Sequence, residues 1–160
     1  MRANYLGVLL LCGLMFSGWA HSQTWAVPLD FNTSPTYVSQ ENTCNFQPQQ
    51  LVIADTGDTI FAPFLVYRVT DRNVSSRLNR PWSVQLLPQF GYLDFSIWVC
   101  DNHVGNTLFN CSDASDNGPG MVNNVTVPGF YPGTHYIVVA GNVDGQVQNC
   151  GPYTLVATKH

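Results

Sequence analysis

Three residue types that hydrolytic enzymes use lie close together in the second half of the sequence. Asp101, His103 and Ser112 supply a carboxylate, an imidazole and a hydroxyl within one short stretch. Such groups can act as orienting acid, base and nucleophile, but a triad is defined by geometry and not by nearness in sequence. None of the known nucleophile motifs surrounds Ser112. We therefore predict no enzyme, and keep a small secreted hydrolase with a loop site near His103 as an alternative.

Acidic and amide side chains gather in the same stretch. Calcium binds about six to eight oxygen ligands, which carboxylates, amides and backbone carbonyls supply. The spacing does not match an EF-hand loop, and Asp and Asn are also good turn formers. We therefore expect no cofactor. A calcium-stabilised structural protein is the second alternative, and its predicted ligands are Asp101, Asn102, Asp113 and Asp116.

Aromatic side chains could form a platform on which a sugar ring or a peptide stacks. The candidates are Trp82, Tyr92 and Trp98. Trp98 is the strongest of them, because the alternation of its strand places it on the face opposite Phe95, Ile97 and other apolar residues. An exposed face would make Trp98 a binding residue, whereas a strand covered on both faces would make it part of the core.

The cysteines predict an oxidised, exported chain. Cys12 lies in an apolar leader, and the four that remain are an even number, typical of two disulfides. Cys100 and Cys111 lie at the two ends of a short stretch rich in Gly, Asn and Asp, which favours their pairing and leaves Cys44 to pair with Cys150. A zinc site is disfavoured because there is no C-x-x-C pair.

The first twenty residues have the pattern of a secretory signal peptide. Arg2 precedes an apolar run over residues 6–16, and the small residues Gly18 and Ala20 precede the expected cleavage site. The run is shorter than the roughly 20 residues that cross a bilayer, so we predict no membrane span. The sequence thus predicts a leader (1–20), an N-terminal extension that can add an edge strand (21–42) and one domain (43–160), located in the periplasm or outside the cell.

Period-two alternation of apolar and polar side chains predicts the elements that position all these residues. Gly, Pro, Asn and Asp clusters separate the alternating segments, and the turn at residues 55–58 predicts a hairpin. Seven or eight short strands of this kind indicate an all-β fold, an antiparallel β-sandwich. The predicted strands are residues 50–53, 59–69, 82–87, 92–100, 122–127, 134–140 and 153–157.

The charge balance excludes one class of partner. Charged residues make up 10% of the chain, against roughly 25% in an average soluble domain. Removing the leader takes away Arg2 and leaves five basic side chains against ten acidic ones, a formal charge of minus five. No basic surface for nucleic acid is expected from this composition.

Four segments together resemble the bacterial pre-peptidase C-terminal (PPC) domain family: TGDTIFAPFLV (56–66), GYLDFSIWVCD (91–101), NNVTVPGFYPGTHYIVVAG (123–141) and GPYTLVA (151–157). The resemblance covers about two-thirds of the chain. It implies a jelly-roll-like sandwich, found as a non-catalytic module on secreted hydrolases and sometimes tied to calcium or polymer binding. We expect no catalytic domain beside it. We therefore predict a secreted recognition or structural module, whose partner is an extracellular polymer or protein.

Overall fold

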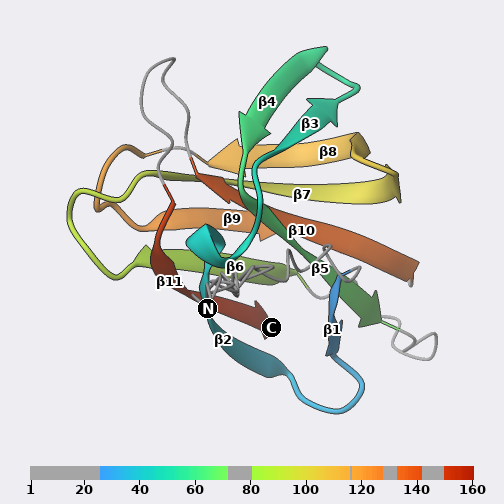
Figure 1. Ribbon diagram of the computed structural model, residues 1–160. Helices are drawn as coiled ribbons and strands as arrows, with labels where there is room; N and C mark the ends of the chain where they lie inside the picture. Colours follow the sequence, from blue (N-terminus) through green and yellow to red (C-terminus); the bar gives the residue numbers. More distant parts are fainter. Residues whose placement is uncertain (1–25, 72–80, 116, 128–132, 142–149) are drawn as a thin grey trace, which may run out of the picture.

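The chain folds as a sandwich of two β-sheets. The computed structural model describes residues 26–71, 81–115, 117–127, 133–141 and 150–160, so the predicted leader lies outside the described part. Within that part, every regular element except one short helical turn is a strand (Figure 1). The predicted all-β sandwich is confirmed. The same residues contain no helix with the length and apolar character needed to span a bilayer.

The described residues form a succession of strands and one 3-10 turn. In chain order they are β1 (Val27–Asp30), β2 (Thr36–Asn42), the 3-10 turn η1 (Thr43–Asn45), β3 (Gln49–Ile53), β4 (Asp58–Ala62), β5 (Phe64–Asp71), β6 (Trp82–Pro88), β7 (Phe95–Val104), β8 (Thr107–Ser115), β9 (Asn123–Val127), β10 (Gly133–Gly141) and β11 (Pro152–Lys159).

The described residues form eleven strands where the sequence predicts seven or eight. The N-terminal extension forms two edge strands, β1 and β2. Pro63 has no N–H and a fixed φ, so it divides the predicted strand 59–69 into β4 and β5. The stretch after Cys100, expected as a loop, is a hairpin of β7 and β8, whose turn contains Gly105 at φ +59.

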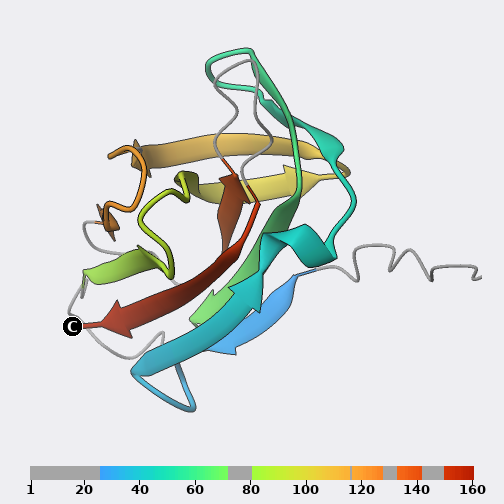
Figure 2. The ribbon, with the colours of Figure 1, turned by 60° about the vertical axis from the view of Figure 1, so that its left-hand side comes forward.

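Two sheets make up the layers. The larger has the strand order β1-β5-β10-β7-β8-β3-β4, and the smaller has the order β2-β11-β6-β9. Figure 2 shows β2 and β11 side by side in one layer and β7 with β8 in the other. The pairings are antiparallel as predicted, except that β1 runs parallel to β5 and β3 runs parallel to β8.

The main core lies between the two sheets. Alternate residues of β5, β7 and β10 face alternate residues of β6, β9 and β11. Each large apolar side chain buried in this way contributes about 1.5–3 kcal/mol to folding. The fully or almost fully buried members include Tyr67, Val69, Val84, Leu86, Phe95, Ile97, Ile137, Val139, Tyr153 and Leu155.

A second apolar cluster, here called the outer cluster, lies on the other face of the larger sheet. It contains Phe64 and Val66 of β5, Trp98 of β7, and Leu51 and Ile53 of β3. β3 belongs to the same sheet as β5 and β7, yet its side chains pack on the outer face of these strands. The end of the sheet that contains β3 and β4 is therefore curled over that face. In Figure 1, β3 and β4 rise away from β7 and β8 at this end.

A hydrogen bond between two tyrosines joins the sheets inside the main core. The hydroxyls of Tyr67 in β5 and Tyr153 in β11 lie 2.8 Å apart, and both side chains are fully buried. The Tyr67 hydroxyl also donates to Ser39 Oγ of β2 at 3.4 Å. Burial raises the pKa of Tyr67 to about 12 and raises the pKa of Tyr153 well above its usual value. Both phenols are therefore neutral over the physiological range.

Both predicted disulfides are present. Cys44 pairs with Cys150, with Cα atoms 4.9 Å apart, and joins the end of β2 to the start of β11. Beside it, Thr43 and Gly151 exchange backbone and hydroxyl hydrogen bonds. Cys100 pairs with Cys111, directly opposite it on β8, with Cα atoms 3.9 Å apart.

We predict that removing one hydroxyl of the tyrosine pair destabilises the protein more than removing both. Tyr67→Phe leaves the buried Tyr153 hydroxyl without that partner, at a cost of about 1–3 kcal/mol, whereas the double phenylalanine variant leaves no buried phenol to satisfy. Urea unfolding of the two single variants and the double variant gives the coupling energy. Additive single losses would contradict this prediction.

We also predict that stability falls as pH rises above 10. Because the folded-state pKa values are raised, the native state keeps two protons that the unfolded chain has released. The loss begins near the ordinary tyrosine pKa and continues to about 12 for Tyr67, with a slope of about 1.4 kcal/mol per pH unit for each tyrosine. Unfolding curves at successive pH values measure it. The Tyr67→Phe, Tyr153→Phe double variant should show a shallower fall.

Candidate functional site

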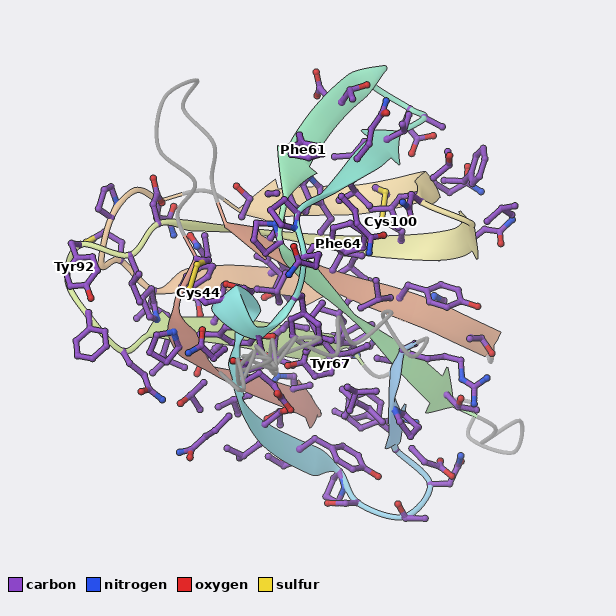
Figure 3. The ribbon with its side chains drawn as sticks, in the orientation of Figure 1. Cys44, Phe61, Phe64, Tyr67, Tyr92 and Cys100 are labelled. Atoms are coloured by element: carbon purple, nitrogen blue, oxygen red, sulfur yellow. A yellow bond between two sulfur atoms is a disulfide. The ribbon has the colours of Figure 1, made fainter. Side chains whose placement is uncertain are left out.

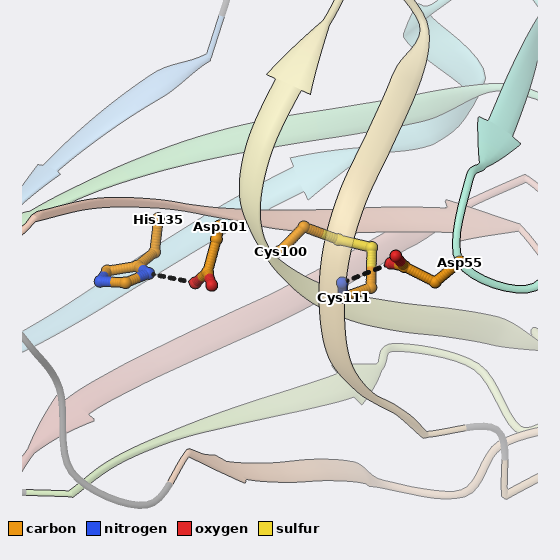
Figure 4. A network of polar contacts seen from close by, with 5 residues as sticks. All are labelled: Asp55, Cys100, Asp101, Cys111 and His135. Carbon is orange, nitrogen blue, oxygen red and sulfur yellow. Dashed lines mark hydrogen bonds and ion pairs between the residues drawn. A yellow bond between two sulfur atoms is a disulfide. The ribbon is translucent and has the colours of Figure 1, made fainter.

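The predicted hydrolytic residue Asp101 contacts a histidine that the sequence analysis did not select. The Asp101 carboxylate contacts His135 of β10, with 3.0 Å between Oδ1 and Nδ1 (Figure 4). The register explains the pair, because Cys100 lies opposite Tyr136 and the next residues along are Asp101 and His135. The backbone of His103 pairs with Leu108, while the side chains of His103 and Ser112 lie outside the described part.

The surroundings of His135 point to a structural contact. The imidazole is almost buried at 8% exposure, faces the space between the sheets, and lies 6.4 Å from the Trp82 ring between centroids. The Asp101 side chain is 58% exposed. A carboxylate that orients an imidazole is one part of a hydrolytic triad. Here the Asp101 carboxylate also gives the almost buried His135 ring a hydrogen-bond partner at the edge of the main core.

Of the four predicted calcium ligands, the structure describes the side chains of Asp101 and Asn102. Asp101 and Asn102 are consecutive residues of β7, so their side chains point to opposite faces of the sheet. In β8, Ala114 pairs with Trp98 and Ser112 pairs with Val99, so Asp113 between them is the extra residue of a β-bulge. Asp116 lies outside the described residues. Among the described side chains, no three His, Cys, Asp or Glu residues gather closely enough to hold a metal ion.

The Cys100–Cys111 disulfide is tied to the curled end of the sheet. Asp55, in the β3–β4 turn, accepts a hydrogen bond from the Cys111 backbone N–H at 2.8 Å (Figure 4). The turn is the predicted hairpin, in which the Gly57 N–H donates to the Ile53 carbonyl at 2.8 Å. Asp55 therefore helps to hold β3 and β4 over the outer cluster.

Of the three aromatic residues predicted to bind a ligand, the structure leaves one on the surface. Trp82 is 2% exposed in the main core, and Trp98 is 8% exposed in the outer cluster. Burial removes both as stacking surfaces, because Trp82 of β6 lies between the sheets and Trp98 belongs to β7, which is covered on each face. Tyr92 is 70% exposed and lies at the rim of the molecule, away from the interior residues Phe64 and Tyr67 (Figure 3).

Tyr92 stacks on a neighbour that sequence reasoning missed. The rings of Phe90 and Tyr92 are parallel within 4°, with centroids 5.6 Å apart. Phe90 is 48% exposed. We call these two residues the aromatic platform. The only sequence signal for Phe90 is its place in a Phe-Gly-Tyr triplet between two strands, where strand alternation no longer accounts for large rings.

A second exposed segment lies against the backbone of the turn that carries the platform. Gly120 donates its N–H to the Leu93 carbonyl at 2.7 Å, and a Cβ on Gly120 would lie 2.6 Å from the Gly91 carbonyl oxygen. Met121 and Val122 follow directly and are 56% and 40% exposed. The backbones of residues 89–93 and 117–122 are thus in contact, and apolar side chains project from both.

Buried groups fix both segments to the sandwich. Residues 90–93 form a turn in which the Leu93 N–H donates to the Phe90 carbonyl at 3.1 Å, and the Leu93 side chain is 2% exposed. Asn123 is fully buried, donates to the Phe95 carbonyl, and accepts from the Asn117 N–H at 2.9 Å. The platform therefore rests on the core through short, hydrogen-bonded connections.

A scan against protein-family models gives no match for this chain, and a search of curated proteins gives none either.

We predict that Gly120→Ala destabilises the protein more than Gly118→Ala. Both glycines have positive φ, +71 and +88, so alanine is strained at each. Only Gly120 is also in steric contact, since a Cβ at Gly118 meets nothing within 4 Å. Urea unfolding should show an excess loss of about 1–3 kcal/mol for Gly120→Ala. Equal losses would mean that the two segments separate easily.

Proposed function

We propose that this chain is a secreted, non-catalytic recognition module that binds an extracellular polymer or protein through the aromatic platform. The observation that carries the proposal is the stacked, solvent-exposed pair of Phe90 and Tyr92 on a fixed turn. Buried packing does not explain these rings, unlike those of Trp82 and Trp98. Exposed apolar patches on soluble proteins mark interaction sites.

The distribution of exposed apolar side chains supports the same end of the sandwich. Among the described residues, seven large hydrophobic side chains are exposed, and four belong to the two segments in contact: Phe90, Tyr92, Met121 and Val122. The others, Val38, Phe61 and Val104, belong to three different strands. Binding residues on loops held by a rigid scaffold are the usual arrangement in such folds.

The chemistry of the rest of the chain is compatible with this role. The two disulfides suit an oxidising compartment, in line with the predicted leader. The resemblance to the PPC family supports an accessory module in place of a catalytic one. The Asp101–His135 pair is accounted for by its position at the end of the core.

We predict that the purified protein binds at least one component of an array of immobilised glycans and extracellular matrix proteins, and that Tyr92→Ala lowers this signal about tenfold. Phe61→Ala is the matched control, because Phe61 is an exposed aromatic residue on β4. It should leave the signal unchanged. An array without any signal, or equal losses for both variants, would refute the proposal.

A further inference from the structure

The platform also indicates which class of ligand it suits. We propose that the aromatic platform binds a neutral polysaccharide of β-linked, gluco-configured pyranose rings, with a sugar ring stacked on Phe90 or Tyr92. This inference rests on the proposed function and narrows its ligand from an extracellular polymer or protein to one chemical class.

The arrangement of the rings favours a flat ligand. Because the planes of Phe90 and Tyr92 differ by only 4°, a flat ring lying on one of them is parallel to the other as well. A gluco-configured pyranose with β linkages carries its hydroxyls at the rim and exposes C–H groups on its two faces. Those C–H groups are weakly positive and meet the negative face of an aromatic ring.

The two segments in contact carry no charged side chain, which favours a neutral ligand. Residues 89–93 (QFGYL) and 117–122 (NGPGMV) include no acidic or basic side chain. A polyanion would therefore find no cation in these two segments. The polar groups that the segments do carry are the Tyr92 hydroxyl and the side-chain amides of Gln89 and Asn117, which can hydrogen-bond to sugar hydroxyls.

The small area of the platform favours a sugar chain over a folded protein. A stable protein–protein interface needs roughly 800 Å² on each partner, and the apolar surface here comes from four side chains on two short segments. Sugar stacking requires only one or two rings. The turn at residues 90–93 is already fixed by the buried Leu93 side chain, so binding orders few groups and loses little entropy.

Isothermal titration calorimetry with cellohexaose, a β-linked glucose hexamer, tests the inference. The wild-type protein should bind it, and should bind a galactose hexamer, whose axial hydroxyl makes one face polar, about tenfold more weakly. Tyr92→Ala and Phe90→Ala should each weaken cellohexaose binding about tenfold. Tyr92→Phe keeps the ring and should stay within about threefold of the wild type, while Phe61→Ala should equal it. Melting curves confirm that each variant is folded.

The outcomes distinguish a wrong ligand class from a wrong recognition function. No cellohexaose binding by the folded wild type overturns the inference, and if matrix proteins still bind the array through Tyr92, the recognition role stands alone. Cellohexaose binding that survives both Tyr92→Ala and Phe90→Ala overturns the platform as its site. Equal binding of the glucose and galactose hexamers overturns the proposed preference for gluco-configured rings.

Discussion

Three neighbouring strands of the larger sheet, β5, β7 and β10, carry apolar side chains on both faces, and covering both faces is the constraint on which the fold depends. The smaller sheet covers one face and forms the main core. The other face is covered by the curled end of the same sheet, where Leu51 and Ile53 meet Phe64 and Trp98. A sandwich whose sheet stayed flat would expose the outer cluster to water.

The contacts around the Cys100–Cys111 disulfide are part of this solution. The disulfide fixes β7 to β8 at the point where β8 passes the curled hairpin. Asp55 then connects the hairpin turn to the backbone of Cys111. Cys100 and Cys111, at the two ends of the stretch where a metal or catalytic loop was predicted, therefore help to support the outer cluster. The aromatic platform lies on a different connection, between β6 and β7.

The sequence predicts well those features that depend on local alternation or spacing. Strands with one buried set of side chains, such as β9 and β11, have a clear period of two, and the four cysteines pair as their spacing suggests. β8 was missed because it is rich in Asn, Ser and Asp, and its strand character comes from pairing with β7. Trp98 is buried because β3, which is distant in sequence, covers its face of β7. Alternation alone therefore does not decide whether Trp98 is exposed or part of the core.

The candidate sites are harder to predict because they depend on register and on contacts between loops. Asp101 and His135 are 34 residues apart and meet only through the alignment of β7 with β10. Reasoning from sequence neighbours therefore selects His103 in place of His135. Phe90 is recognised as a candidate binding residue only from its stacking on Tyr92 and from the contact between Gly91 and Gly120.

The bond between Cys44 and Cys150 links positions 106 residues apart. If a protease cuts one peptide bond between these two cysteines, the two pieces stay covalently joined as long as the disulfide is intact. Such a nick does not release a fragment, and the two sheets hold the pieces in register through their strand pairings. A protein built in this way can stay in one piece after a single cut by a protease, whereas the same chain without that disulfide could lose a fragment.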